Sequence, residues 1–192
     1  MDIRVYRILP QTKMAGPGLR FCLWVQGCSR HCKGCMAAET WPHEAGFLMQ
    51  TGEILQCVIS AGDVEGITFL GGEPFEQAAA VGELAQKVKV MGLSVVVFTG
   101  FTYEELLEKE DKSVQSLLRH TDLLIDGPFV QAMFDLSRPW VGSSNQQYRF
   151  LTGKYSARDL ENIRNQIEVR LSPDGKAFLN GMGDFGRLKK LL

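Results

Sequence analysis

Three cysteines crowd into the stretch Gly27-Cys28-Ser29-Arg30-His31-Cys32-Lys33-Gly34-Cys35, which directly follows an apolar run from Phe21 to Gln26. A short apolar run of this kind predicts a buried β-strand, and in a parallel α/β fold functional sites are built where such strands end. Thiolates spaced C-x-x-x-C-x-x-C suit zinc or an iron–sulfur cluster. A four-iron cluster held by three cysteines keeps one iron open to a further ligand. The stretch therefore predicts a metal centre at the carboxyl end of a strand.

A closed zinc site would need a fourth protein ligand. His31 and His43 are candidates, but no second paired motif follows in the sequence. The two cysteines outside the cluster, Cys22 and Cys57, lie in an apolar strand and in the apolar stripe of a helix, where a free cysteine usually packs. The pattern therefore favours an iron–sulfur cluster on the three clustered cysteines.

Further apolar runs of strand length alternate with stretches of helical period along the chain. The other predicted strands are Ile3–Leu9, Gly66–Leu70, Leu93–Phe98 and Asp122–Ile125. Alternation of this kind is typical of a βα-repeat fold with a largely parallel sheet.

Apolar positions at helical spacing predict the helices between these strands. One apolar stripe follows Thr51, and a second ends at Gly92, a residue suited to the position just after a helix. A third helix is predicted from Tyr103 to Leu118, because Thr102 and Glu105 have the spacing of a capping box and apolar residues recur at helical intervals behind them.

The C-terminal part is predicted to hold a short fourth helix after Ser156 and a hairpin around Pro173-Asp174-Gly175. No linker, low-complexity tract or repeat interrupts the chain. Its 192 residues (21.4 kDa), 45% hydrophobic and 22% charged, suit one globular core. We therefore expect residues 1–192 to form a single domain.

Charge and cysteine content narrow the function classes. A net charge of -1 and a pI near 6.3 give no general electrostatic reason to bind nucleic acid or anionic lipid. No apolar run approaches the ~20 residues that span a bilayer, and the first residues carry no apolar signal core. An odd number of cysteines, five, without such a signal indicates thiols used for metal or redox chemistry. We expect a cytoplasmic protein that binds neither nucleic acid nor membrane.

The cysteine motif and several motifs around it together resemble the radical S-adenosylmethionine superfamily, and within it the small activating enzymes of anaerobic ribonucleotide reductase. The resemblance runs across nearly the whole chain. The motifs that carry it besides the cysteines are Gly16-Pro17-Gly18-Leu19-Arg20, Thr40-Trp41, Gly71-Gly72-Glu73-Pro74, Thr99-Gly100-Phe101-Thr102, Asp126-Gly127-Pro128-Phe129 and Gly142-Ser143-Ser144-Asn145-Gln146.

The resemblance implies a cofactor and a reaction. Cys28, Cys32 and Cys35 would hold a 4Fe-4S cluster whose open iron is chelated by the amino and carboxylate groups of S-adenosylmethionine. An electron from the cluster would cleave the sulfonium, releasing methionine and a 5′-deoxyadenosyl radical that abstracts hydrogen from the substrate. Many members carry an aromatic residue before the last cysteine to touch the adenine, whereas this chain has Gly34 there. Met36 is the predicted adenine contact instead.

The resemblance also implies contacts after the second core strand. Gly71 and Gly72 lack a Cβ, so the backbone can approach the methionine moiety and offer carbonyls to its amino group, with Glu73 adding charge. The alternative is a plain strand-to-helix turn with Pro74 at the first helical position.

Polar residues at later strand ends are further candidates for cofactor binding. Thr99 and Asp126 can hydrogen-bond a ribose or methionine group, and Asn145 with Gln146 can bind cofactor or substrate backbone. The alternatives are helix or turn capping for the first two and the bracing of a loop for the other two.

The expected fold is α/β, an incomplete β/α barrel (a partial TIM barrel) with mostly parallel strands, because a full barrel needs ~250 residues. Its open side would admit a macromolecule. The expected function is generation of a glycyl radical on an anaerobic ribonucleotide reductase or related glycyl-radical enzyme, with an external donor of flavodoxin or ferredoxin type. Two alternatives stay open. One is a stand-alone radical enzyme that modifies a ribosomal peptide. The other is a non-catalytic iron–sulfur electron-transfer module, which would want four cysteine ligands.

Overall fold

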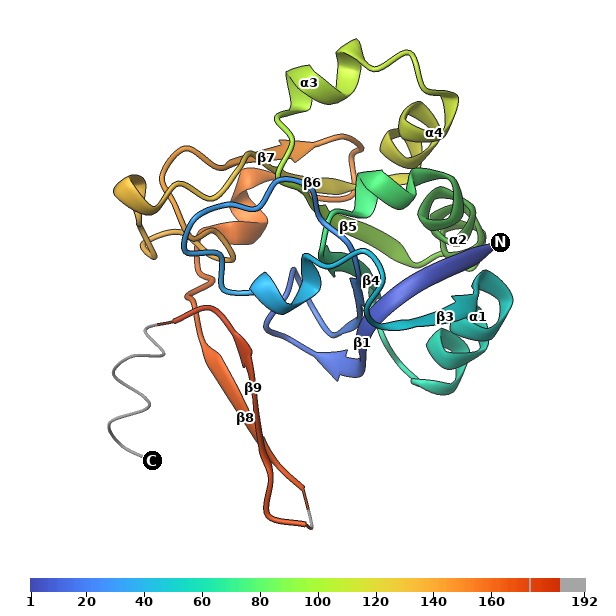
Figure 1. The fold of residues 1–192 in the computed structure, drawn as a ribbon, viewed down its shortest axis with the longest axis horizontal. Helices are drawn as coiled ribbons and strands as arrows, with labels where there is room; N and C mark the ends of the chain where they lie inside the picture. Colours follow the sequence, from blue (N-terminus) through green and yellow to red (C-terminus); the bar gives the residue numbers. More distant parts are fainter. Residues whose placement is uncertain (173, 184–192) are drawn as a thin grey trace.

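The computed structural model describes residues 1–172 and 174–183, and a seven-stranded sheet forms its centre (Figure 1). The strands are Asp2–Thr12 (β1), Arg20–Val25 (β2), Phe47–Gln50 (β3), Gly66–Gly71 (β4), Ser94–Phe98 (β5), Leu123–Asp126 (β6) and Gln147–Phe150 (β7). Their spatial order is β3-β1-β2-β4-β5-β6-β7. Each strand predicted within this sheet is present, with ends that differ by a few residues.

The middle of the sheet is parallel and its two edges are antiparallel. β2, β4, β5 and β6 pair in parallel, as expected for a βα-repeat fold. β1 joins antiparallel to β2 and to β3 at one edge, and β7 joins antiparallel to β6 at the other. The edge strands β3 and β7 are not paired with each other, so the sheet is an open, incomplete barrel, which confirms the predicted fold class.

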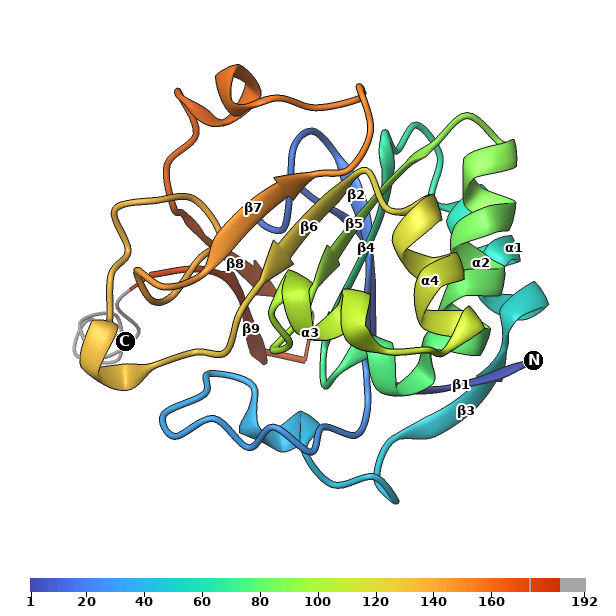
Figure 2. The ribbon, with the colours of Figure 1, turned by 90° about the horizontal axis from the view of Figure 1, so that it is seen from above.

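Three helices cover one face of the sheet (Figure 2). They are α1 (Thr51–Ser60), α2 (Ala78–Val90) and α4 (Lys112–His120), and α2 packs against both of the others. Gly92 follows the end of α2 with φ +80°, the left-handed conformation predicted there. No helix of this group covers the opposite face, where Trp140, Val141 and Leu160 pack on β5 and β6.

Alternation within β2 separates these two faces. Phe21, Leu23 and Val25 are fully buried in the core beneath the helices. Cys22 and Trp24 point to the other face and pack in a different cluster. Because side chains alternate along a strand, one apolar strand builds both the helix-covered core and the interior of the open barrel.

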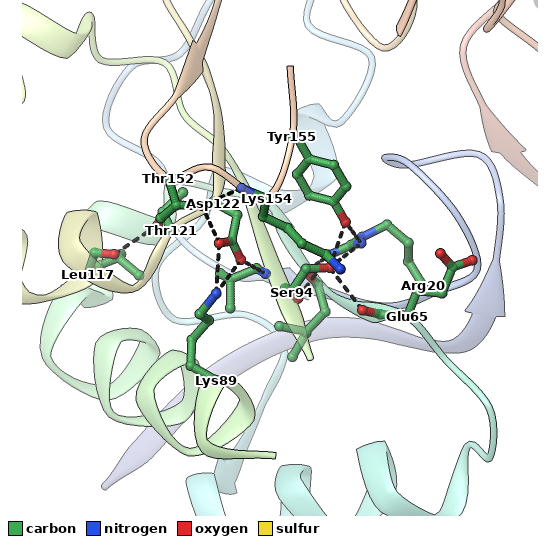
Figure 3. A network of polar contacts seen from close by, with 12 residues as sticks. Arg20, Glu65, Lys89, Ser94, Leu117, Thr121, Asp122, Thr152, Lys154 and Tyr155 are labelled. Atoms are coloured by element: carbon green, nitrogen blue, oxygen red, sulfur yellow. Dashed lines mark hydrogen bonds and ion pairs between the residues drawn. The ribbon is translucent and has the colours of Figure 1, made fainter. Parts of the chain in front are cut away.

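A polar network closes the amino-terminal end of the parallel strands (Figure 3). The Arg20 guanidinium is fully buried and donates to the Thr68 and Ser94 hydroxyls at 2.6 and 3.0 Å. Lys89 contacts the buried Asp122 carboxylate at 2.7 Å. The network lies at the end of the sheet opposite the cysteines, where residues of such folds generally serve stability.

The predicted helix from Tyr103 to Leu118 is wrong as a single element. The structure has two helices, α3 (Tyr103–Glu108) and α4, separated at residues 109–111. The predicted capping box of Thr102 and Glu105 is present and starts α3. The Asp111 side chain accepts from the Ser113 amide at 2.7 Å and caps α4, so a second helix start interrupts the pattern.

The helix predicted after Ser156 is only the 3-10 turn η4 (Ala157–Leu160). Downstream, Asn165 accepts from the Trp140 amide at 2.8 Å and donates to the carbonyls of Leu136 and Arg138 at 2.9 and 2.8 Å. These tertiary bonds hold the chain in an extended path. The other described 3-10 helices are η1 (Ala38–Thr40), η2 (Pro74–Gln77) and η3 (Gln131–Met133).

The predicted C-terminal hairpin is confirmed as β8 (Ile167–Leu171) and β9 (Ala177–Gly181), an antiparallel pair that projects from the body in Figure 1. Of its predicted turn, Pro173 lies outside the described residues. Polar side chains fasten the hairpin to β1: the Thr12 hydroxyl donates to Glu168 at 2.8 Å and accepts from the Asn180 amide at 3.0 Å.

No helix within residues 1–172 and 174–183 combines the length and the apolar composition needed to cross a membrane. Whether residues 1–192 form a single domain stays a prediction.

Candidate functional site

A cavity of about 370 Å³ opens at the carboxyl ends of β2, β4, β5 and β6. It brings together most of the residues singled out in the sequence. Those that line it are Cys28, Cys32, Cys35, Met36, Gly71, Gly72, Glu73, Thr99 and Gln146. Residues from four separate strand ends and loops therefore share one cavity, as expected for the carboxyl face of such a fold.

Backbone hydrogen bonds hold the start of the cysteine loop against η1 and the residue that follows it. The Gly27 amide donates to the Thr40 carbonyl at 2.7 Å, and the Cys28 amide donates to the Trp41 carbonyl at 3.1 Å. The indole of Trp41 also stacks on the His31 imidazole, with 4.8 Å between ring centroids. These contacts give the Thr40-Trp41 motif a physical role, because it closes the base of the loop.

Glu76 of η2 fastens the loop from the other side. Its carboxylate accepts from the Ser29 amide at 2.9 Å and from the Ser29 hydroxyl, and it contacts the His43 imidazole at 2.9 Å. The turn after β4 thereby fixes the position of the cysteine loop.

The three cysteines line part of the cavity, and none of them is paired in a disulfide. Burial raises the pKa of the Cys28 thiol to about 11. Within the described residues, no three His, Cys, Asp or Glu side chains converge closely enough to hold a single metal ion. A four-iron cluster contacts its cysteines through different irons and needs thiols around a space rather than around a point. The three cysteines around a shared cavity fit that requirement.

The two remaining cysteines pack where the sequence predicts. Cys22 is fully buried on the barrel side of β2, and burial raises the pKa of its thiol to about 12. Cys57 packs against the helix-covered core. Neither lines the cavity.

Glu73 joins two strand ends. Its buried carboxylate accepts from the Phe75 amide at 3.0 Å, the Thr99 hydroxyl at 2.8 Å and the Gly100 amide at 2.8 Å. Burial raises the pKa of Glu73 to about 7, although these three donors favour its ionised form. The Thr99 hydroxyl, having donated to Glu73, also accepts from the Phe101 amide at 3.1 Å. Both side chains therefore shape the cavity wall through bonds to the protein.

The glycines of this turn are required by close backbone contacts. A Cβ on Gly72 would lie 2.2 Å from the Gly27 carbonyl oxygen. Gly71 has φ +102°, and a Cβ there would lie 2.7 Å from the Trp24 Cβ. The expected close approach exists, but it is an approach of the chain to itself. Pro74 begins η2 as predicted for the turn.

Asp126 and Asn145 do not line the cavity. Asp126 accepts from the Tyr103 amide at 2.9 Å and from the Arg149 guanidinium at 3.0 Å. Asn145 donates to the Pro128 carbonyl at 2.8 Å, while its buried Oδ1 has no partner among the described residues. These contacts match the alternatives of capping and loop bracing.

Several cavity residues were not predicted, including Tyr6, Arg7, Trp24, Phe129, Trp140 and Asn180. Alternation along the strand could have placed Trp24 on the barrel side, and Phe129 belongs to a motif at a strand end. The ring of Phe129 approaches within 3.3 Å of the position that a Cβ on Gly34 would take. An aromatic side chain thus lies beside the position where the sequence has only glycine.

Comparison with known proteins identifies the family of this chain. The model of the family described as "4Fe-4S single cluster domain" matches residues 14–149. The anaerobic ribonucleoside-triphosphate reductase-activating protein of Vibrio cholerae is 35% identical over 152 residues, covering 73% of this chain and 94% of that protein. Proteins of the same name from Haemophilus influenzae and Enterobacteria phage T4 are 33% and 30% identical, over 71% and 73% of this chain and 91% and 90% of their own lengths.

Among solved structures, QueE from Escherichia coli resembles this fold with a TM-score of 0.50 and 17% sequence identity. The similarity covers 68% of this chain and 61% of that one. At this identity the likeness concerns the fold alone, and it agrees with the open, partial barrel.

Proposed function

This chain belongs to the 4Fe-4S single cluster domain family, among the anaerobic ribonucleoside-triphosphate reductase-activating proteins, and we propose that it generates a glycyl radical on a partner enzyme. The partner is an anaerobic ribonucleotide reductase or a related glycyl-radical enzyme. One observation carries the proposal: the three closely spaced cysteines line the same cavity as the glycine turn after β4, inside a barrel that is open at its edges.

In this proposal Cys28, Cys32 and Cys35 hold the 4Fe-4S cluster. When bound, the cluster supplies the electron that cleaves S-adenosylmethionine to methionine and a 5′-deoxyadenosyl radical. The protein's task is to position these groups. The bonds from Glu76 and Thr40 fix the cysteine loop, so the three thiols that would hold the cluster are kept at the cavity.

We propose that S-adenosylmethionine lies between the glycine turn and Met36. The Gly71-Gly72 backbone offers carbonyls to the methionine amino group, and Met36, which lines the cavity and is half-exposed, contacts the adenine. Glu73 and Thr99 hold the turn in place through their mutual hydrogen bond. For Asp126 and Asn145 the observed contacts favour support of the surrounding loops over direct binding.

The reductant is proposed to be an external donor of flavodoxin or ferredoxin type, because the sequence has no further cysteine group after Cys57. None of the five cysteines, all of which lie in the described residues, is paired in a disulfide, which suits a reducing compartment, so we propose the cytoplasm as the location.

The test is to incubate the anaerobically reconstituted protein with the anaerobic reductase of the same organism, S-adenosylmethionine and a reductant. We expect a glycine-centred doublet in electron paramagnetic resonance, lost when the radical-bearing glycine of the reductase is changed to alanine. Cleavage of S-adenosylmethionine without that doublet, together with a mass change in a small peptide from a neighbouring gene, would favour the peptide-modifying alternative. Absence of any cleavage would favour an electron-transfer module.

A further inference from the structure

One wall of the cavity comes from outside the span that the family model matches. The matched span is residues 14–149, and it contains the cysteines and the glycine turn. The remaining wall includes Tyr6 and Arg7 of β1 and residues 179–182 at the end of the C-terminal hairpin. Apart from Arg7, the residues of this wall are mostly apolar. The charged side chain of Arg7 therefore requires an explanation.

Arg7 is the residue of this wall whose side chain has an unsatisfied hydrogen-bond donor among the described residues. Its guanidinium lies over the Trp24 ring, 4.2 Å from the ring centroid. The Nε atom is buried and has no hydrogen-bond partner among the described residues. Burial lowers the pKa of Arg7 from its ordinary value, but an arginine remains charged at neutral pH. A half-buried cation on a mostly apolar cavity wall is costly unless an anion pairs with it.

The charged residues near Arg7 form their hydrogen bonds and ion pairs with other residues. Arg30, the other arginine at the cavity, pairs with Glu105 at 3.2 Å. The charge of Glu168 on the nearby hairpin favours the charged form of Arg7, but its carboxylate makes its short hydrogen bonds with Thr12 and Arg170, both at 2.8 Å. Trp24 covers one flat face of the Arg7 guanidinium, which leaves the two Nη atoms to bind a ligand in the plane of the group.

We propose that Arg7 binds a carboxylate of a molecule that occupies the cavity. The two Nη atoms of an arginine form a planar fork that matches the two oxygens of a carboxylate, and Arg7 lines the cavity. This proposal rests on the proposed function and adds a ligand contact to it. The carboxylate has two possible sources. One is an acidic side chain or the C-terminus of the polypeptide substrate. The position of Arg7 outside the span that the family model matches favours this source. The other is the α-carboxylate of S-adenosylmethionine.

The test uses the cluster-loaded protein and the variants Arg7→Met and Arg7→Lys. The matched control is Arg4→Met, on the same strand, whose guanidinium donates to the Ala45 carbonyl at 3.3 Å on the exposed side. Circular dichroism and iron content establish that each variant is folded and loaded. Arg7→Lys keeps the positive charge but lacks the planar pair of nitrogens, so it can be measured in place of Arg7→Met if that variant fails to fold.

The first arm measures the dissociation constants of S-adenosylmethionine and of its decarboxylated analogue. If the cofactor supplies the carboxylate, Arg7→Met weakens S-adenosylmethionine binding roughly 10- to 100-fold and changes binding of the analogue little. The second arm measures the KM for the reductase in glycyl-radical formation. If the substrate supplies the group, this KM rises by a similar factor, while reductant-driven cleavage of S-adenosylmethionine alone is unchanged.

In either arm we expect Arg7→Lys to recover part of the effect and Arg4→Met to match the wild type. Wild-type values for Arg7→Met in both arms overturn the proposal. A wild-type chain that forms no glycyl radical contradicts the proposed function instead, and the cofactor arm then decides alone: unchanged S-adenosylmethionine binding by Arg7→Met overturns the role of Arg7.

Discussion

The Thr99 hydroxyl donates a 2.8 Å hydrogen bond to the Glu73 carboxylate, and this contact joins the residues that follow two adjacent parallel strands, β4 and β5. The same carboxylate accepts from the Gly100 amide at 2.8 Å. Glu73, which the sequence predicts to add charge near a cofactor, therefore also links two strand ends. Because both strands end at the cavity, this link shapes the wall of the site.

Glu73 should make stability depend on pH. Burial raises its pKa to about 7 in the folded protein, whereas the unfolded carboxyl ionises near 4.5. The folded state therefore binds more protons between these values, and the free energy of unfolding should fall as pH rises through this window, by on the order of 3 kcal/mol. Denaturant unfolding of the wild type and Glu73→Gln across this range measures the effect. Glu73→Gln should lack this component, and equal slopes for the two proteins would contradict it.

Gly72→Ala should disturb the cysteine loop itself. The new Cβ would lie 2.2 Å from the Gly27 carbonyl oxygen, next to Cys28, so the backbone must move. We expect a loss of at least about 2 kcal/mol in unfolding free energy and a reduced iron content, beyond weaker cofactor binding. Gly52→Ala is the control, because a Cβ on Gly52 meets no atom within 4 Å. A Gly72→Ala protein with full iron content and wild-type stability would show that this contact relaxes easily.

Cysteine variants should separate cluster ligands from packed cysteines. Replacing Cys28, Cys32 or Cys35 by alanine should abolish both the cluster absorbance and the reductive cleavage of S-adenosylmethionine. Cys57→Ala should retain both, because Cys57 packs against the helix-covered core. Iron analysis and detection of 5′-deoxyadenosine measure the outcomes. Full cleavage activity in any of the first three variants would remove that cysteine from the ligand set.

Arg20→Met should destabilise the fold without touching the site. Arg20 is fully buried and donates six hydrogen bonds, so its loss leaves several acceptors unsatisfied. We expect a loss of roughly 3–5 kcal/mol in unfolding free energy. Tyr155→Phe, which removes one partner hydroxyl of Arg20 and Ser94, should cost only about 1 kcal/mol. Similar losses for the two variants would mean that the network tolerates the loss of its centre.

The sequence determined the parallel centre of the sheet and the location of the site. Buried parallel strands are short apolar runs, so β2, β4, β5 and β6 can be recognised one at a time. The cysteine spacing and the glycine turn are likewise local patterns, and each follows a strand end. Short edge strands are different, because β3 and β7 contain exposed or half-exposed residues and form only by pairing with a strand already in place.

Only the tertiary structure decided which polar residues share the cavity. Asp126 and Thr99 occupy equivalent places at strand ends in the sequence, yet Arg149 of β7 engages the first while the second lines the cavity. Arg7 and Asn180 lie far apart in the sequence and face the same space because the hairpin docks on β1. The physical reason is the difference between local and long-range interactions. Strand and loop patterns follow from neighbours along the chain, whereas a side chain's partner depends on which distant segment packs beside it.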